Sequence, residues 1–136
     1  MTSKLMPPAA RGARPAHTRA MKILDFASPL AGDISRPAPD RLVAGDPEQT
    51  VANYFSDDTG QFHAGRWSST RGKWRIRYSE SEFCCLTTGR VVLENRAGER
   101  WEFGPGQAFV VPSGFEGTWE VVEDCTKFYA IFETRT

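Results

Sequence analysis

The chain has 136 residues, with 17 basic and 17 acidic side chains, so its formal net charge is zero. This length is enough for one domain with a hydrophobic core. Residues 1–24 hold five basic side chains and no acidic one, so residues 25–136 hold 12 basic and 17 acidic side chains, a net of −5. An acidic globular part argues against nucleic acid as a partner. No stretch approaches the roughly 20 apolar residues of a membrane span.

The first 45 residues predict a mostly irregular N-terminal arm that is partly disordered. They are rich in Pro, Ala, Gly and Arg, and Pro7, Pro8 and Pro15 would break an amphipathic targeting helix. We therefore interpret the basic end as a disordered tail, with Met21 as an alternative start. Three alternatives stay open for the arm: it lies across the following domain, it lies on a neighbouring subunit, or it is loose.

Residues 46–136 predict an all-β domain. Nine short segments are aromatic or β-branched and are separated by turn residues. These candidate strands are 51–55, 61–67, 73–79, 82–87, 90–94, 99–103, 107–112, 116–123 and 125–133. No segment sustains a helical period bounded by caps. Strands of this number and spacing predict a sandwich or a barrel.

Two glycine-bounded patterns select between these architectures. In the first, Glu82 is followed by six residues and then by Gly89; in the second, Gly106 precedes an apolar strand and Pro112-Ser-Gly114. Together they resemble the two halves of the cupin signature, G-x5-H-x-H-x3,4-E-x6-G and G-x5-P-x-G-x2-H-x3-N. This resemblance, over roughly residues 46–134, implies a double-stranded β-helix, the cupin jelly-roll barrel.

The sequence after the second pattern resembles one branch of this superfamily. Residues 114–121, Gly-Phe-Glu-Gly-Thr-Trp-Glu-Val, and Lys127-Phe-Tyr129 are similar to small single-domain cupins related to (S)-ureidoglycine aminohydrolase and to ethanolamine-utilisation cupins. Many members of that branch have no assigned activity. Related cupins often dimerise, so we expect a homodimer in which outward apolar residues are buried; these are Phe83, Val122 and Phe128.

The resemblance also implies where a metal would bind. Metal-binding cupins hold Mn, Fe, Ni or Zn with three His and one Glu on the inner wall. The Glu position is Glu82, and the first two His positions fall at Arg75 and Arg77 or at Ile76 and Tyr78. We favour Ile76 and Tyr78, because the apolar face of this strand should point inward and its cations outward.

The third histidine position falls at Gly117, so all three histidines are missing on either alignment. One carboxylate alone does not hold a transition metal, and we expect no metal and no cofactor. A divalent metal (Mn, Fe, Ni or Zn) bound weakly through Glu82, Tyr78 and the Cys84 thiolate stays as an alternative. His63 could point inward and complete a partial site, or it is a satisfied core or surface residue.

Pleat parity gives the expected cavity wall. If Glu82 and position 117 face inward, the wall is an aromatic lining with a few polar tips, including Lys127 from the last strand. Such a mixture suits a small organic ligand. We expect seven residues to bind it: Trp74, Ile76, Tyr78, Glu82, Cys84, Trp119 and Tyr129. The alternative is that these aromatic side chains only pack the core.

Glu82 decides between two functions. A buried carboxylate needs a partner, which Lys127 in a structural ion pair, or Tyr78, would supply. Our main expectation is a metal-free or weakly metal-binding barrel that binds a small organic metabolite without chemistry. The alternative is an aminohydrolase- or isomerase-like enzyme in which Glu82 is the acid/base and Tyr78 or Lys127 polarises the substrate. Cys84 is interpreted as an inert buried thiol.

Two surface and redox features complete the interpretation. A basic cluster surrounds one predicted strand and is either a solvated face or a site for anionic ligands; it consists of Arg66, Arg71, Lys73, Arg75 and Arg77. The three cysteines are odd in number and form no C-x-x-C pair. They therefore indicate a reducing compartment, which we take to be the cytoplasm.

Overall fold

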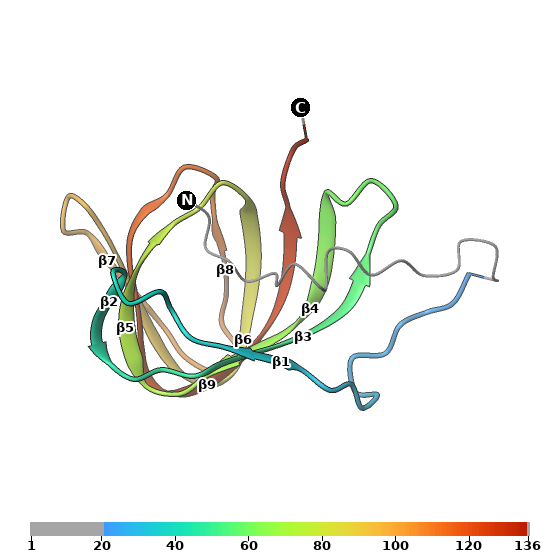
Figure 1. Ribbon diagram of the computed structural model, residues 1–136, viewed down its shortest axis with the longest axis horizontal. Helices are drawn as coiled ribbons and strands as arrows, with labels where there is room; N and C mark the ends of the chain where they lie inside the picture. Colours follow the sequence, from blue (N-terminus) through green and yellow to red (C-terminus); the bar gives the residue numbers. More distant parts are fainter. Residues whose placement is uncertain (1–20, 136) are drawn as a thin grey trace.

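A computed structural model describes residues 21–135, and the predicted basic tail within residues 1–20 lies outside this range. All regular structure in residues 21–135 is strand, and no helix long and apolar enough to cross a membrane occurs there. Figure 1 shows the strands wrapped into one curled layer around a common interior. The strands are β1 (Asp33–Ser35), β2 (Leu42–Gly45), β3 (Gln49–Ser56), β4 (Phe62–Ser69), β5 (Gly72–Arg77), β6 (Ser81–Asn95), β7 (Arg100–Phe103), β8 (Ala108–Val111) and β9 (Glu116–Phe132).

Two long strands, β6 and β9, hold the barrel together. Residues 81–88 of β6 pair with residues 126–132 of β9, and residues 90–95 pair with residues 117–123. β4 pairs with the C-terminal half of β9, while β5 pairs with its N-terminal half. β8 and β7 pair with the first and second halves of β6. Each long strand therefore belongs to both walls of an antiparallel jelly roll, which confirms the predicted all-β jelly-roll architecture.

Gly89 lies in the middle of β6, where the sequence predicts a turn between two strands. Its φ is 83°, a conformation that glycine adopts without strain. The register with β9 shifts around it, and a Cβ on Gly89 would lie 2.3 Å from the carbonyl oxygen of Asp124. The glycine therefore bends a continuous strand from one wall to the other instead of ending it. The predicted strands 82–87 and 90–94 are one strand.

The same correction applies to the predicted strands 116–123 and 125–133, which form the single strand β9. Its bend falls at residues 122–124, where three successive side chains are exposed. On either side of the bend, alternate residues are buried. The other five predicted strands correspond to β3, β4, β5, β7 and β8, with ends that differ by at most two residues.

The described part of the arm lies across the barrel, which was one of the alternatives. β1 pairs with β3, and β2 pairs with β5, so both short strands extend the sheet; the sequence did not predict them. Phe26 stacks on Tyr54 with ring centroids 4.6 Å apart and meets the Phe128 ring edge-on at 5.7 Å. Arg66 Nη1 donates a hydrogen bond to the Phe26 carbonyl oxygen at 2.8 Å.

The core fills the space between the two walls. Its buried apolar side chains come from β3 to β6, β8 and β9, and three of them are tryptophans. Trp67 lies at the centre, with its ring centroid 5.6 Å from that of Trp119 and 6.2 Å from that of Trp74. Burial of such large rings supplies much of the hydrophobic stabilisation of a small β domain. The interior position of this cluster places it around the predicted site.

Candidate functional site

Alternating burial along β5 places its apolar side chains inside the barrel. Trp74, Ile76 and Tyr78 are at most 5 % exposed, whereas Arg75 and Arg77 are exposed on the opposite face. The geometry of a β-strand explains this alternation, because successive side chains point to opposite sides of the sheet. The predicted choice of Ile76 and Tyr78 as the inward pair is therefore confirmed.

Glu82 lies at the start of β6 and is fully buried in the barrel. Its Oε1 accepts a hydrogen bond from the Tyr78 hydroxyl at 2.6 Å. Its Oε2 lies 2.9 Å from the ammonium nitrogen of Lys127, which is fully buried on β9. The predicted ion pair is present, and Tyr78 is the second partner of the same carboxylate.

The Lys127 ammonium lies between two indole rings. Nζ is 4.2 Å from the ring centroid of Trp119 and 4.7 Å from that of Trp67, distances at which a cation is attracted to an aromatic face. The ammonium also donates to the Cys84 sulfur at 3.5 Å. A carboxylate, a thiol and two rings thus surround one internal cation, which compensates for the loss of its hydration.

These contacts determine the charge states of the interior groups. Burial, followed by the charge of Glu82, raises the pKa of the Tyr78 hydroxyl well above its ordinary value and also raises the pKa of the Cys84 thiol. Burial alone would lower the pKa of Lys127, but Cys84 and Glu82 beside it outweigh that effect and raise it. These directions favour a protonated phenol and a protonated thiol beside a charged ammonium, in keeping with the expectation that Cys84 is an inert buried thiol.

The space left inside the barrel is small. A cavity of about 10 Å³ lies beside this cluster, bounded by Trp74, Ile76, Tyr78, Trp119 and Lys127, and by Gln49 and Trp67. That volume is about the minimum for one water molecule. The Trp119 indole N–H has no hydrogen-bond partner among the described residues. Such an orphaned buried donor is a position where a single water would bind.

The residues at the expected metal positions do not fit a divalent metal ion. Ile76 has no ligating atom, and a Cβ at Gly117 would lie 1.9 Å from the backbone oxygen of Glu94, so no histidine side chain can be built there. The ammonium of Lys127 already lies against the carboxylate of Glu82. No group of three or more His, Cys, Asp or Glu side chains in residues 21–135 is arranged to hold an ion.

Two other predicted residues form hydrogen bonds to partners outside this cluster. The Tyr129 hydroxyl donates to Oδ1 of Asn53 at 2.7 Å, while burial, followed by the charge of Glu82, raises the pKa of Tyr129. His63 is buried, with Nδ1 2.7 Å from the Ser56 hydroxyl and Nε2 3.1 Å from the carbonyl oxygen of Gly60. His63 is therefore a satisfied core residue, and it completes no partial metal site.

Sequence reasoning missed Trp67 and Gln49. Trp67 faces inward from β4, and its indole N–H donates to the side-chain oxygen of Gln49 at 3.0 Å. Trp67 shares a face of β4 with the buried residues His63 and Gly65, so pleat parity could have placed it. Gln49 lies at the first position of β3 with no pattern around it, and nothing in the sequence marks it.

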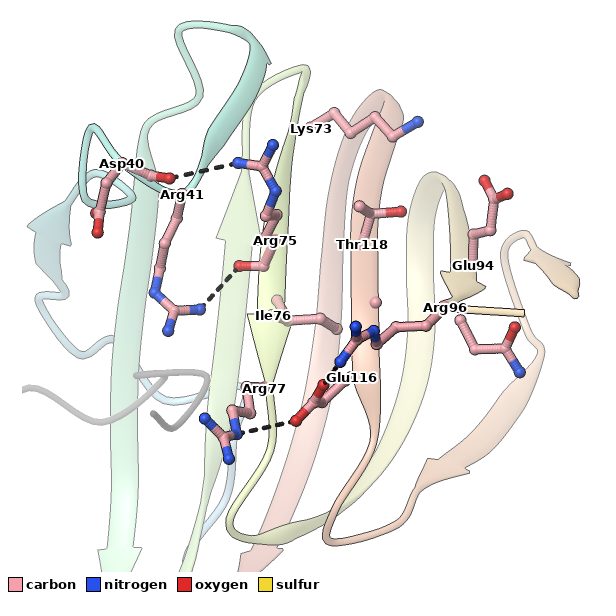
Figure 2. A pocket seen from close by; sticks show the side chains of 12 residues that line it. Asp40, Arg41, Lys73, Arg75, Ile76, Arg77, Glu94, Arg96, Glu116 and Thr118 are labelled. Atoms are coloured by element: carbon pink, nitrogen blue, oxygen red, sulfur yellow. Dashed lines mark hydrogen bonds and ion pairs between the residues drawn. The ribbon is translucent and has the colours of Figure 1, made fainter. Parts of the chain in front are cut away.

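A second and larger hollow lies on the opposite face of β5 and β9. It has a volume of about 660 Å³, and Figure 2 shows its charged side chains projecting from the strands and from the loop before β2. We call it the outer groove. Its lining residues are Asp40, Arg41, Lys73, Arg75, Ile76, Arg77, Glu94, Asn95, Arg96, Glu116, Gly117 and Thr118. Three members of the predicted basic cluster, Lys73, Arg75 and Arg77, lie here.

One acid of the outer groove is doubly paired. Glu116 lies 3.1 Å from Nε of Arg77 and 2.9 Å from Nη1 of Arg96. The hydrogen bond from Arg96 lowers the pKa of Glu116, since it favours the charged carboxylate. Arg41 Nη1 donates instead to the backbone oxygen of Arg75 at 3.2 Å, as Figure 2 shows. Nothing in the sequence near Arg41 marked this loop as part of a site.

Comparison with known structures places this fold among the cupins. A crystal structure of a protein of unknown function from Pseudomonas syringae pv. tomato is 28 % identical, with a TM-score of 0.71 over 79 % of this chain and 46 % of that chain. The chain thus spans less than half the length of that protein. The EutQ protein of Clostridium difficile is 11 % identical, with a TM-score of 0.58 over 65 % of this chain and 64 % of that one.

Ectoine synthase from P. lautus has the same fold. It is 14 % identical, with a TM-score of 0.56 over 65 % of this chain and 66 % of that chain. None of the curated proteins matches the chain. The family model of the EutQ-like cupin domain matches residues 56–129, more than half of the sequence. The chain therefore belongs to the EutQ-like cupin domain family.

Proposed function

We propose that this protein is a metal-independent cupin that binds a small organic metabolite without transforming it. The observation that supports it most is the buried ion pair between Glu82 and Lys127, with 2.9 Å between Oε2 and Nζ. In metal-binding cupins, by the resemblance above, this glutamate is a metal ligand. Here the ammonium of Lys127 supplies the positive charge that the carboxylate needs, so the barrel requires no ion for its neutrality.

The metabolite site follows from the sizes of the two hollows. Four of the seven interior residues expected to bind the ligand, Trp74, Ile76, Tyr78 and Trp119, line a space of about 10 Å³, so the binding role of the seven stays a prediction that depends on the barrel opening. The outer groove has about 660 Å³, within the range of roughly 300–1,000 Å³ that is typical of small-molecule sites. We therefore assign the metabolite to the outer groove.

The test combines metal analysis with ligand screening on the untagged full chain. Elemental mass spectrometry, with and without added Mn or Fe, should find far less than one ion per chain. A panel of organic acids, phosphate esters, sugars, amino acids and amines should include a compound that raises the melting temperature, with no effect of a chelator. Stoichiometric metal held against dialysis, or no shift across the panel, would contradict the proposal.

An aminohydrolase- or isomerase-like enzyme is the second candidate. Its support is the hydrogen-bonded chain from Tyr78 through Glu82 to Lys127, which contains an acid, a base and a route for a proton. Against it, Glu82 and Lys127 are fully buried and the adjacent space has the volume of about one water. If the enzyme hypothesis holds, Glu82→Gln abolishes turnover of the bound compound while the fold remains; full turnover in that variant ends it.

The remaining parts of the proposal concern family branch, assembly and compartment. The likeness to (S)-ureidoglycine aminohydrolase rests on the segment after Gly114. A homodimer is supported by the exposed rings of Phe83 and Phe128 and the exposed Val122, although Phe26 of the same chain covers part of Phe128. Sedimentation at micromolar concentration tests it, and a monomer would contradict it. A cytoplasmic location is supported by the free cysteines.

A further inference from the structure

The outer groove concentrates positive charge on an otherwise acidic domain. Five of its lining residues are cations and three are acids, so its formal charge is +2, whereas residues 25–136 as a whole have a net charge of −5. The five cations are Arg41, Lys73, Arg75, Arg77 and Arg96. A local excess of this kind in a concave site attracts anions and raises their local concentration.

The acids of the groove do not neutralise all of these cations. Glu116 is shared by Arg77 and Arg96, and Glu94 lies 3.7 Å from Arg100, which is outside the groove lining. Asp40 contributes its backbone carbonyl, which accepts a hydrogen bond from Arg75 Nη1 at 3.3 Å. Three cations therefore form no ion pair with a carboxylate within residues 21–135: Arg41, Lys73 and Arg75.

Arg41 and Arg75 are fixed in place by backbone oxygens rather than by acids. Arg41 donates to the carbonyl of Arg75, Arg75 donates to that of Asp40, and the Arg75 backbone N–H donates to the Arg41 carbonyl at 2.8 Å. Each guanidinium has five N–H donors, so most of them stay available. The side chains are thus ordered before any ligand binds, which lowers the entropy cost of binding.

The groove floor between these charges offers further donors at close range. Thr118 faces the groove from β9, opposite Arg75 in the sheet register, and Figure 2 shows this side chain between Arg75 and Glu94. Ile76, whose side chain is buried toward the barrel interior, and Gly117 also border the groove and add no charge to it. A ligand with a short carbon chain and acidic ends matches this distribution of charge and shape.

We propose that the outer groove binds a small organic dianion, with Arg41, Arg75 and Lys73 as its main contacts. Planar guanidinium groups pair with carboxylate or phosphate oxygens by two parallel hydrogen bonds, which is stronger and more specific than a single contact. Two negative charges match the formal charge of +2 in the lining. This inference rests on the proposed function, because it gives the ligand class for the metabolite site assigned there.

The experiment is isothermal titration calorimetry on the untagged full chain at low ionic strength. The probes are succinate, glycerol 3-phosphate and inorganic phosphate, with succinamide as the uncharged counterpart of succinate. We expect at least one dianion to bind, succinamide not to bind, and 0.5 M salt to weaken the binding. Tighter binding of succinate points to a pair of carboxylates, and tighter binding of the phosphates points to a phosphate ester.

Variants locate the site. Arg41→Gln and Arg75→Gln should each weaken the best dianion at least about tenfold. Lys73→Gln should weaken it severalfold, and the Lys73 ammonium forms no ion pair with the part of the chain that the structure describes. Arg71→Gln is the matched control, since Arg71 is an exposed arginine just before β5 that does not line the groove. Circular dichroism verifies that each variant is folded.

The outcomes separate this inference from the proposed function. If a neutral or cationic metabolite binds and the groove variants leave its affinity unchanged, the protein is still a metabolite-binding cupin and the dianion inference is wrong. If no compound of the metabolite panel or of the probes binds, both are wrong. If Arg71→Gln weakens succinate as much as Arg75→Gln, the attraction is a general charge effect and the outer groove is not the site.

Discussion

The barrel interior and the outer groove hold charged side chains under opposite conditions. Inside, Lys127 and Glu82 are fully buried and neutralise each other at 2.9 Å. In the groove, Arg41 and Arg75 donate hydrogen bonds to backbone oxygens and form no ion pair with any carboxylate of the described residues 21–135. A buried charge must be paired for the protein to fold, whereas a charge at the surface can stay unpaired at little cost. Charged side chains that a ligand could reach therefore lie on the outer face of β5, whereas the inner face of the same strand is packed in the core.

The two faces of β5 show how one strand both packs the core and lines the outer groove. Its inward residues, Trp74 and Ile76, pack the core, and its outward residues, Lys73 and Arg75, line the groove. Substitutions on the inner face should therefore change stability, and those on the outer face should change binding. The predictions below test this division.

The largest expected effect is that of Lys127→Met. Removal of the ammonium leaves the Glu82 carboxylate buried without its ion-pair partner, and breaking such a pair costs about 3–5 kcal/mol. Urea denaturation measures the loss. The double variant Lys127→Met/Glu82→Gln should be more stable than Lys127→Met alone, because no uncompensated charge remains. Equal stability of the single and double variants would show that loss of Lys127 leaves no uncompensated charge at Glu82, which contradicts the argument from the ion pair.

The second effect concerns the closed metal position. Gly117→Ala should lower the free energy of unfolding by about 3 kcal/mol, since its Cβ would lie 1.9 Å from the Glu94 backbone oxygen and the strands must separate. Gly104→Ala is the matched control, because the nearest atom to its Cβ would be the end of the flexible Arg90 side chain at 2.9 Å, with no backbone atom as close. A Gly117→Ala variant as stable as the wild type would mean that position 117 still has room for a ligating side chain.

The sequence predicted features that depend on a short local pattern, but not features that depend on pairing between distant segments. The inward face of β5 followed from alternation within seven residues, whereas Lys127 was an open alternative on the last strand as the partner of Glu82. Gly89 was read as a turn because a glycine with positive φ serves a turn and a bulge equally well, and only the pairing with β9 distinguishes them. Sequence alone gave no such pairing.

The groove depends on contacts between distant segments. Arg41 reaches the carbonyl of Arg75 across 34 positions, and β2 beside it is a four-residue strand whose side chains are all exposed. Short exposed strands have no hydrophobic alternation, so they leave no local signal. The basic residues of β5 were recognised as a cluster, but the loop that makes a groove of them was not.

The third effect is a decrease in the free energy of unfolding at alkaline pH, which we expect from the buried thiols of the barrel interior. Burial raises the pKa of Cys84, and it raises that of Cys125 to about 11, from an ordinary value near 9. Between pH 9 and 10 the unfolded chain releases these protons while the folded chain retains them, so stability falls as the pH rises, by about 1 kcal/mol for each thiol. Lys127 has a raised pKa, so its contribution is complete below about pH 10.5 and is lost only above that.

Urea titrations at pH 8, 9 and 10 measure this slope. Cys84→Ala should reduce the slope of unfolding free energy against pH by the contribution of one thiol, whereas Arg75→Gln in the groove should leave this slope unchanged. A slope that does not respond to Cys84→Ala would show that the thiol is accessible to solvent, and the contrast between a sealed interior and an open groove would fail.

The smallest expected effect distinguishes two arginines of the same groove. Arg96 is 80 % exposed in its side chain and pairs with Glu116, so Arg96→Gln should change stability by no more than about 0.5 kcal/mol. It should also weaken the best dianion less than about threefold, against at least tenfold for Arg75→Gln, because the charge of Arg96 is already committed to Glu116. Calorimetric titration of the two variants in one buffer gives the ratio. If both weaken the ligand equally, total charge rather than unpaired charge governs the groove, and the outer face is a diffuse positive surface.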